Sequence, residues 1–234
     1  MSSQADTPIL ANKYMDMAKQ IVRKAQEEGR EYSEEKLAPT TEAEKCAAAA
    51  DACPDQGIPK RIIDTMTSEI LETPAMLAIS EFLTKPKEAW CIVLAGPKGC
   101  GKSTAAGFYL WSKTMSSLAS PPKTRRWWTA SRLARVSGYN QDFEPLIQVP
   151  TMVIDDLGVE YLDKNGYFSH RLDEIIDERY SNYRPTIITT NLNGRDFRAR
   201  YGDRVIDRIR EGFPYGGKYI EINNNSMRIN GNER

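Results

Sequence analysis

The stretch AGPKGCGKST at positions 95–104 contains residues whose types and spacing could bind phosphate. Gly96, Gly101, Lys102 and Ser103 match the pattern G-x-x-x-x-G-K-[ST]. Glycines in such a loop let backbone N–H groups turn toward a phosphate, and the N-terminus of a following helix adds the positive end of its dipole. We predict that this loop holds a nucleoside triphosphate. The expected nucleotide-binding residues are Gly96, Pro97, Lys98, Gly99, Cys100, Gly101, Lys102, Ser103 and Thr104.

Two residues of the loop have specific expected roles. Lys102 would reach the β- and γ-phosphates, so we expect its side chain to face solvent rather than the core. The Ser103 hydroxyl would bind Mg²⁺. Residues 90–95 (WCIVLA) form a short apolar run, which is typical of a strand buried on both faces, and residues 103–113 have the pattern of a helix. A phosphate-binding loop requires this strand–loop–helix context; an ordinary glycine turn is the alternative interpretation.

Acidic and amide side chains follow two later strand-like segments. Asp155 and Asp156 end the segment TMVIDD (151–156), and Asn191 ends PTIITTN (185–191). One carboxylate at a strand end can hold Mg²⁺ while a second orients the attacking water. We assign the metal to Asp155 and water activation to Asp156, which is one methylene shorter than a glutamate. Asn191 would contact the γ-phosphate or the water; the alternative is an asparagine in a turn.

Strand-like and helix-like segments alternate along the chain, which predicts an α/β fold with a parallel five-stranded sheet between helices. Thr73 and Pro74 have the types of an N-cap and a first helical residue, so a helix is expected as far as Leu83. The other expected strands are 125–130, 151–156, 185–191 and 218–222, and the other expected helices are 131–137, with Ser131 as its cap, 166–182 and 203–211.

Composition excludes several classes of protein. The 234 residues have a formal net charge of zero, so the chain as a whole is not an electrostatic nucleic-acid binder. No apolar run is long enough to span a membrane and the N-terminus lacks a secretory pattern, so we expect a cytoplasmic protein without a membrane partner. Four cysteines without a C-x-x-C pair, together with a single histidine, make a zinc site unexpected.

The chain is expected to have two parts. Residues 1–55 would form an N-terminal helical, partner-binding segment and linker, and residues 56–234 the nucleotide-binding domain. Within the first part, residues 12–30 place apolar side chains at helical spacing opposite a charged face. This helix could pack on the core or dock on another protein.

Four blocks, GPKGCGKS, MVIDDLG, TIITTN and GDRVIDRIR, together with the earlier GIPKR, resemble the DnaC/DnaI-type replicative helicase loaders, which are AAA+ ATPases. They also resemble the IstB-type transposition helper ATPases, which share the same core. The resemblance spans about residues 58–222. It implies a P-loop AAA+ core without a C-terminal lid domain, and hydrolysis that is slow unless a partner stimulates it.

The resemblance also implies roles for individual residues. Asp155 and Asp156 take the Walker B positions, and Asn191 takes the sensor position. Arg208 takes the position of an arginine finger, which would complete the site of a neighbouring copy in an ATP-bound homo-oligomer. The alternative for Arg204 and Arg208, four apart on one helical face, is local ion pairing.

Single-stranded DNA is a further implied partner. Residues 123–135 contain five basic residues, no acidic residue and two tryptophans, and the helix at 131–137 lies where the family has a DNA-associated helix. Single-strand grooves combine such charges with stacking aromatic rings. We assign DNA contact to Arg132 and Arg135. For Trp127 and Trp128 we favour the structural interpretation, in which one ring faces the core and the other faces a covering helix.

The resulting hypothesis is an ATPase that uses ATP and Mg²⁺ to load the replicative hexameric DNA helicase. An IstB-type transposition helper is the alternative. A small-molecule kinase would need an acceptor pocket and an arginine-rich lid, and the sequence indicates neither. An ATP-gated adaptor with negligible turnover stays open because of Asp156 and the missing lid.

Overall fold

The computed structural model describes residues 42–68, 72–85, 89–116, 126–138, 147–161, 166–211 and 218–223. Within them, one parallel five-stranded sheet has the order β2-β3-β4-β1-β5, which confirms the predicted fold class. Its strands are β1 Cys91–Ala95, β2 Trp127–Thr129, β3 Met152–Leu157, β4 Thr186–Thr190 and β5 Lys218–Glu221. The helices are α2 Glu42–Ala52, α3 Lys60–Thr67, α4 Pro74–Leu83, α5 Lys102–Met115, α6 Ala130–Gly138, α8 Tyr167–Ser181, α9 Gly194–Tyr201 and α10 Asp203–Arg210, with a 3-10 turn at Pro54–Gln56.

The strand order determines where the functional side chains meet. β1 lies between β4 and β5, and β3 pairs with the other side of β4. The predicted phosphate-binding loop follows β1, the two aspartates lie next to the last residue of β3, and Asn191 follows β4. Because the carboxyl ends of parallel strands lie at one edge of a sheet, these three segments come together there.

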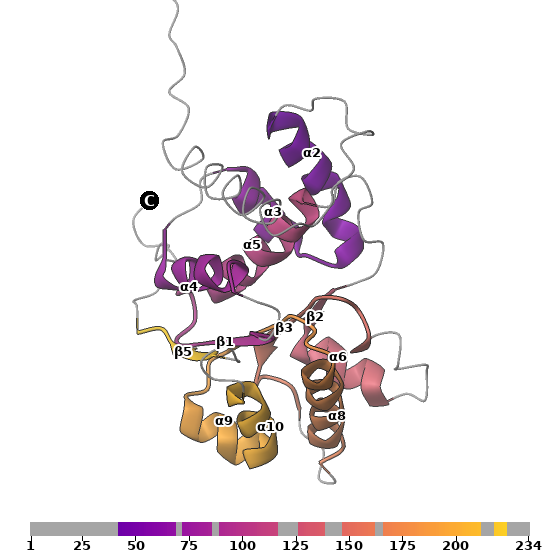
Figure 1. The fold of residues 1–234 in the computed structure, drawn as a ribbon, viewed down its shortest axis with the longest axis vertical. Coiled ribbons are helices and arrows are strands. Elements are labelled where there is room, and N and C mark those ends of the chain that lie inside the picture. The colour runs from indigo at the N-terminus through magenta and orange to yellow at the C-terminus, as the bar shows by residue number, and fades with distance from the viewer. Residues whose placement is uncertain are drawn as a thin grey trace, which may run out of the picture.

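Helices cover both faces of the sheet. Helices α2 to α5 lie on one side, and α6, α8, α9 and α10 lie on the other (Figure 1). The buried side chains accordingly form two apolar clusters, one on each face. Trp127 belongs to the first cluster and Trp128 to the second, and both are buried. The structural interpretation of the two tryptophans is therefore confirmed.

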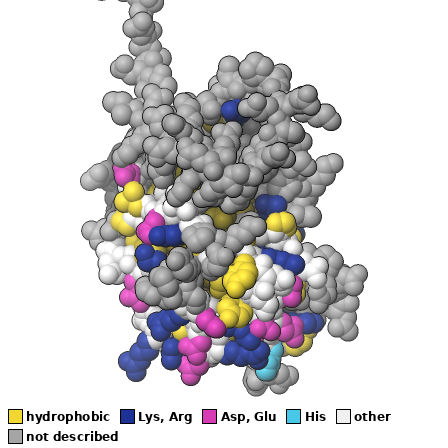
Figure 2. Space-filling view, in the orientation of Figure 1, with side chains coloured by type: hydrophobic (Ala, Val, Ile, Leu, Met, Phe, Trp, Pro, Cys, Tyr) yellow, Lys and Arg dark blue, Asp and Glu magenta, His cyan; other side chains and the backbone are white. Residues whose placement is uncertain are grey.

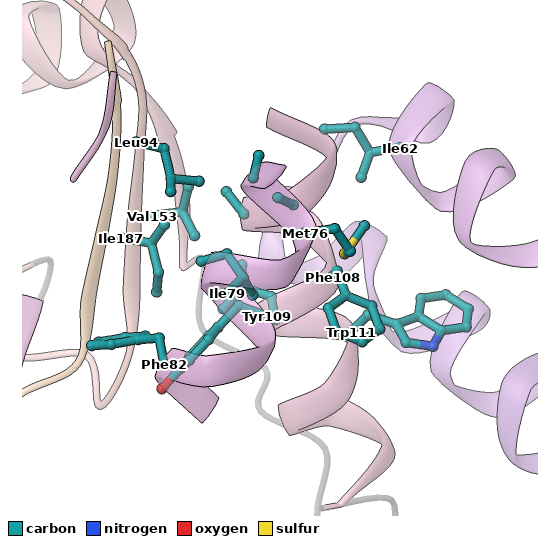
Figure 3. Close-up of a cluster of buried hydrophobic side chains, with 14 of the residues drawn as sticks. Ile62, Met76, Ile79, Phe82, Leu94, Phe108, Tyr109, Trp111, Val153 and Ile187 are labelled. Carbon is teal, nitrogen blue, oxygen red and sulfur yellow. The ribbon is translucent and has the colours of Figure 1, made fainter. Parts of the chain in front are cut away.

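The first cluster joins α4 and α5 to the sheet (Figure 3). Ile79 and Phe82 of α4 and Tyr109 of α5 lie beside Leu94 and Val153 of the sheet. The rings of Phe82 and Tyr109 have centroids 5.6 Å apart. Buried aromatic side chains of this size contribute most of the apolar area that a core removes from water. This packing fixes α5, whose first turn carries Lys102, Ser103 and Thr104 of the predicted phosphate-binding loop.

Helix α3, which the sequence analysis did not predict, approaches α5 closely. A Cβ atom added to Gly107 of α5 would collide with the side chain of Ile62 of α3. Ile62, Ile63 and Met66 form the buried face of α3. The small residue at position 107 therefore brings α3 to the edge of the phosphate-binding loop.

On the opposite face, the buried Arg179 of α8 ties together the segments that precede two strands. Its guanidinium donates hydrogen bonds to the carbonyls of Ile147, Val149 and Pro185, each at 2.8 Å, and to Thr186 Oγ1 at 2.7 Å. A buried guanidinium is stable only when its N–H groups find acceptors, and here they do. Arg179 thus fixes the amino ends of β3 and β4.

Helix caps agree with the sequence in one case and differ in another. Thr73 Oγ1 accepts a hydrogen bond from Met76 N–H at 3.1 Å, so the predicted cap of α4 is confirmed. Helix α6 begins at Ala130, and Thr129 Oγ1 accepts from Arg132 N–H at 3.3 Å, so the prediction of Ser131 as the cap is wrong. Thr129, the last residue of β2, supplies the capping hydroxyl that was expected from Ser131, which lies two residues further along the chain.

Part of the expected N-terminal segment packs on the domain that contains the sheet. Ala49 of α2 and Cys53 after it are fully buried in the first apolar cluster. Residues 42–55 are therefore joined to the core, whereas the predicted helix at 12–30 lies outside the described residues. Among the helices that the structure describes, none is both long and apolar enough to cross a membrane.

Candidate nucleotide-binding site

A pocket of about 520 Å³ lies at the carboxyl edge of the sheet, within the size range of small-molecule sites. It brings together most of the predicted residues: Lys98, Gly99, Gly101, Lys102, Ser103, Thr104, Asp156 and Asn191 line it. Its other wall comes from α3, α4 and the segment after β3, through Arg61, Ile62, Thr65, Thr73, Met76 and Val159. Sequence reasoning gave these no role in the site. The block GIPKR, which includes Arg61, was the one available signal.

The phosphate-binding loop depends on glycine at three positions. Gly96, Gly99 and Gly101 have φ angles of 150°, 86° and 88°, a region that side chains disfavour. An added Cβ on Gly96 would also collide with the carbonyl of Ile222, and one on Gly101 would lie 3.2 Å from Thr73 Oγ1. The loop therefore holds its compact shape only with these residues.

Lys102 differs from the sequence prediction. Its side chain is buried rather than solvent-facing, with 5% of the residue exposed. Its ammonium donates hydrogen bonds to the carbonyls of Gly96 (2.8 Å) and Pro97 (2.7 Å) and to Asn191 Oδ1 (3.1 Å). An ammonium has three donors, and these three acceptors compensate for its burial. Lys102 still lines the pocket, so the prediction was wrong about exposure and not about position.

Asp155 and Ser103 meet directly. Asp155 is buried, and its Oδ1 accepts hydrogen bonds from Ser103 Oγ and from Thr189 Oγ1, both at 2.7 Å. Burial raises the pKa of Asp155, and the hydrogen bonds from Thr189 and Ser103 oppose that rise. Carboxylate and hydroxyl oxygens are the ligands that Mg²⁺ takes, with few protein groups and the remainder from phosphate and water. The residues present therefore fit a magnesium ion.

Asp156 occupies a different environment from its neighbour. The pairing of β3 with β4 is irregular between Ile154 and Leu157, and Asp156 has a φ of 58°. Its N–H donates to Thr189 Oγ1 at 2.9 Å. A left-handed conformation costs roughly 1–2 kcal/mol for a residue with a side chain. The bulge re-aims the side chain, so that Asp156 lines the pocket while Asp155 faces Ser103.

Arg208 lies away from the pocket of its own chain. Its Nη1 is 2.9 Å from Asp173 Oδ1 and its Nη2 is 2.5 Å from Asp177 Oδ1, both on α8, and 15% of its side chain is exposed. Arg204 is 64% exposed and contacts Asp173 at 3.2 Å. Local ion pairs therefore exist, although their acids lie on α8 rather than beside the arginines in sequence.

Arg132 and Arg135 are both exposed on α6. The Arg132 guanidinium lies 5.5 Å from the centre of the Trp128 ring. Leu133 between them is fully buried, which fixes the helix to the sheet. The two arginines thus project from a firmly packed helix. Elsewhere on the visible face, charges of both signs are mixed (Figure 2).

Comparison with known proteins agrees with this geometry. The chain is 36% identical over 80 residues to the replicative helicase loader DnaC of Escherichia coli K12, a match that covers 33% of this chain. The matched part is about a third of the length of that relative, 32%. A crystal structure of the DnaC helicase loader superposes with a TM-score of 0.52 at 22% identity, covering 70% of this chain and 99% of that chain. A crystal structure of DnaI gives 0.52 at 17% identity, covering 74% and 99%. No family model matches the chain.

The fold and the motif residues at the pocket define the class of P-loop α/β domains, and the fold is similar to that of the DnaC and DnaI structures. Within that class the chain is similar to the DnaC/DnaI-type helicase loaders, as the sequence motifs predicted.

Proposed function

We propose that this chain is an ATP-dependent loader of the replicative hexameric DNA helicase. The observation that carries the proposal is a single pocket lined by Lys102, Ser103, Asp156 and Asn191, in a chain similar to DnaC. Binding of ATP and Mg²⁺, slow hydrolysis, contact with single-stranded DNA and assembly of several copies all belong to this proposal.

ATP would lie with its phosphates against the glycine loop and the first turn of α5. Lys102 would exchange its loop carbonyl acceptors for the β- and γ-phosphates, a change that needs only side-chain motion. The apolar wall formed by Ile62 and Met76 suits the base. Arg61, on the same wall, adds positive charge opposite a triphosphate.

Ser103 and Asp155 would hold Mg²⁺, which when bound neutralises charge on the phosphate oxygens. The Ser103 hydroxyl donates its proton to Asp155 and keeps two lone pairs, so it can hold this hydrogen bond and bind the ion at the same time. Asp156 would accept the proton of the attacking water, and Asn191 would orient that water or the γ-phosphate.

Single-stranded DNA would contact Arg132 and Arg135 on α6. Both are exposed, and arginine side chains pair well with backbone phosphates. Replacing both with alanine should lower the affinity for a fluorescently labelled single-stranded oligonucleotide. The slope of log affinity against log salt should become shallower by about 1.4, which is about 0.7 for each lost phosphate contact. Affinity and salt slope equal to those of the wild type would place the DNA contact elsewhere.

The helicase contact is expected in residues 1–41, ahead of the described core. Deleting residues 1–41 should abolish capture of the replicative helicase in a pull-down while leaving ATP affinity unchanged. α2 stays in this variant, so the first apolar cluster keeps Ala49 and Cys53.

The matched comparison is deletion of residues 1–56, which also removes α2. This longer deletion should lower the melting temperature, because it strips buried apolar contacts from α5. Full helicase capture by the shorter deletion would contradict the proposed division of the chain. Loss of ATP binding in the shorter deletion would contradict it as well.

A further inference from the structure

Glu160 is a buried carboxylate that no step proposed above uses. It lies four residues after Asp156, and its side chain is 0% exposed. A buried charge is costly unless hydrogen bonds and an opposite charge surround it. The burial of this carboxylate beside the turn that carries Asp156 therefore needs an explanation.

The two oxygens of Glu160 contact different parts of the molecule. Oε2 accepts a hydrogen bond from Gly158 N–H at 2.7 Å, within the turn that follows β3. Oε1 accepts from Arg200 Nη2 at 3.0 Å and from the hydroxyl of Tyr201, both on α9. Arg200 also donates to the Glu160 carbonyl at 2.6 Å. One side chain thus bridges the turn and the helix.

The turn that Glu160 holds has an unusual backbone. Asp156 and Gly158 both have positive φ angles, 58° and 111°. A weak hydrogen bond from Val159 N–H to the Asp156 carbonyl, at 3.3 Å, closes the turn from within. Residues in sparsely populated conformations persist only where their surroundings determine them. The bond from Gly158 N–H to the Glu160 carboxylate is a charge-assisted constraint of that kind.

The helix at the other end of the bridge continues from the segment that carries Asn191. Asn193 caps α9 through its side chain, which accepts from Asp196 N–H at 2.8 Å. Leu192 also lies close to the turn, because an added Cβ on Gly158 would be 3.0 Å from it. The bridge therefore joins the segments that present Asp156 and Asn191 to the same pocket.

We infer that Glu160 is a positioning residue, which together with Arg200 and Tyr201 holds the Asp156 turn in register with the Asn191 segment. The inference rests on the proposed ATPase function. Glu160 itself is not among the residues that line the pocket. Its contribution is to the geometry in which Asp156 meets the attacking water.

Glu160→Gln tests the inference with a side chain of the same size. The amide has a single oxygen, so it cannot accept from both Gly158 and the Arg200–Tyr201 pair. We expect kcat to fall roughly 10- to 100-fold, as for loss of a partner that orients a metal-site ligand, with ATP affinity within about 3-fold of the wild type. A fall in kcat with nearly unchanged ATP affinity is the signature of a group that is needed in the transition state rather than for binding. Tyr201→Phe, which removes one donor and keeps the ring, should show a smaller loss of the same kind.

Thr114→Val is the matched control, since it removes a buried hydrogen bond, from Gln56 at 2.6 Å, on α5 at the opposite face of the sheet from α9 (Figure 1). It should lower the melting temperature and leave kcat unchanged. Amide hydrogen exchange adds a measurement that does not depend on hydrolysis: Gly158 N–H should exchange faster in Glu160→Gln and at the wild-type rate in Thr114→Val. Should Glu160→Gln fail to fold, Tyr201→Phe supplies both measurements.

Wild-type kcat and wild-type exchange at Gly158 in Glu160→Gln and Tyr201→Phe would overturn the inference. A wild-type chain that binds ATP and never hydrolyses it, even with helicase and DNA, would instead reject the proposed ATPase function. In that case the exchange rates alone decide whether Glu160 holds the turn.

Discussion

Replacing Lys102 with alanine is expected to lower the affinity for ATP by about 100-fold, which corresponds to losing one or two hydrogen bonds to a charged group. The fold should survive, because the ammonium bonds only to the loop and to Asn191 at the pocket. Titration with a fluorescent ATP analogue measures the affinity, and thermal unfolding without nucleotide measures the stability.

Two further variants make this result interpretable. Lys102→Met keeps most of the buried side-chain volume and removes only the charge, so it should lose affinity as the alanine variant does. Lys98→Ala removes an exposed lysine that also lines the pocket, and it should cost less, because water and salt screen an exposed charge more than the buried charge of Lys102. ATP affinity in Lys102→Met equal to that of the wild type would refute the assignment of the phosphate site.

The position of the site could be predicted because its signals are local in sequence. The glycine spacing, the run 90–95 and the aspartates after an apolar segment each depend on neighbouring residues. Parallel pairing then brings the strand ends together. Helix α10 was equally predictable, since its buried residues Val205, Ile206 and Ile209 recur at helical spacing.

Features that depend on distant partners could not be predicted. Helix α9 has only Phe197 and Tyr201 buried and is otherwise polar, so its pattern is weak. In the sequence, Arg179 of α8 looks like a surface residue. Its acceptors lie on the segments before β3 and β4, so the spacing of apolar residues within α8 cannot reveal that its guanidinium is buried. Glu160 was missed for the same reason, since its partners on α9, Arg200 and Tyr201, lie 40 and 41 residues further along the chain.

Lys102 shows a different limit of prediction from the sequence. The motif specifies which residue reaches a phosphate, and it says nothing about where the ammonium lies otherwise. Two of the three acceptors of that ammonium are loop carbonyls, which have no sequence signature, and the third is Asn191 Oδ1. The carbonyls of Gly96 and Pro97 are oriented by glycine conformations that the motif predicts only in general terms.

Arg208 is expected to act on the site of a neighbouring copy, and its replacement with alanine should reduce ATP hydrolysis by roughly 10³-fold or more in the assembled state. A guanidinium near the γ-phosphate stabilises charge that spreads over the phosphoryl oxygens during transfer. In the single chain Arg208 is held by Asp173 and Asp177, so assembly must either release it or use it in place. The variant should bind ATP as the wild type does, because Arg208 does not line its own pocket.

The competing hypothesis is that Arg208 only joins α10 to α8. Partly exposed ion pairs of this kind typically contribute about 1 kcal/mol or less to stability. Arg208→Ala would then lower the melting temperature slightly and leave hydrolysis unchanged. Arg204→Ala is the matched control, because Arg204 lies on the same face of α10 and shares Asp173, yet is far more exposed. A purely structural role predicts a larger loss of melting temperature for Arg208→Ala than for Arg204→Ala, and no change in hydrolysis for either variant.

Mixing two inactive variants distinguishes the hypotheses. Lys102→Ala subunits cannot use ATP but still carry Arg208, and Arg208→Ala subunits bind ATP but lack the arginine. If Arg208 acts between copies, the mixture should hydrolyse ATP although neither variant does so alone, since each arginine can complete the intact pocket of its neighbour. The restored rate should depend on the mixing ratio and vanish on dilution below the assembly concentration. An Arg208→Ala chain that is fully active by itself, with no gain at any ratio, would show that the contacts with Asp173 and Asp177 are the whole role of this residue.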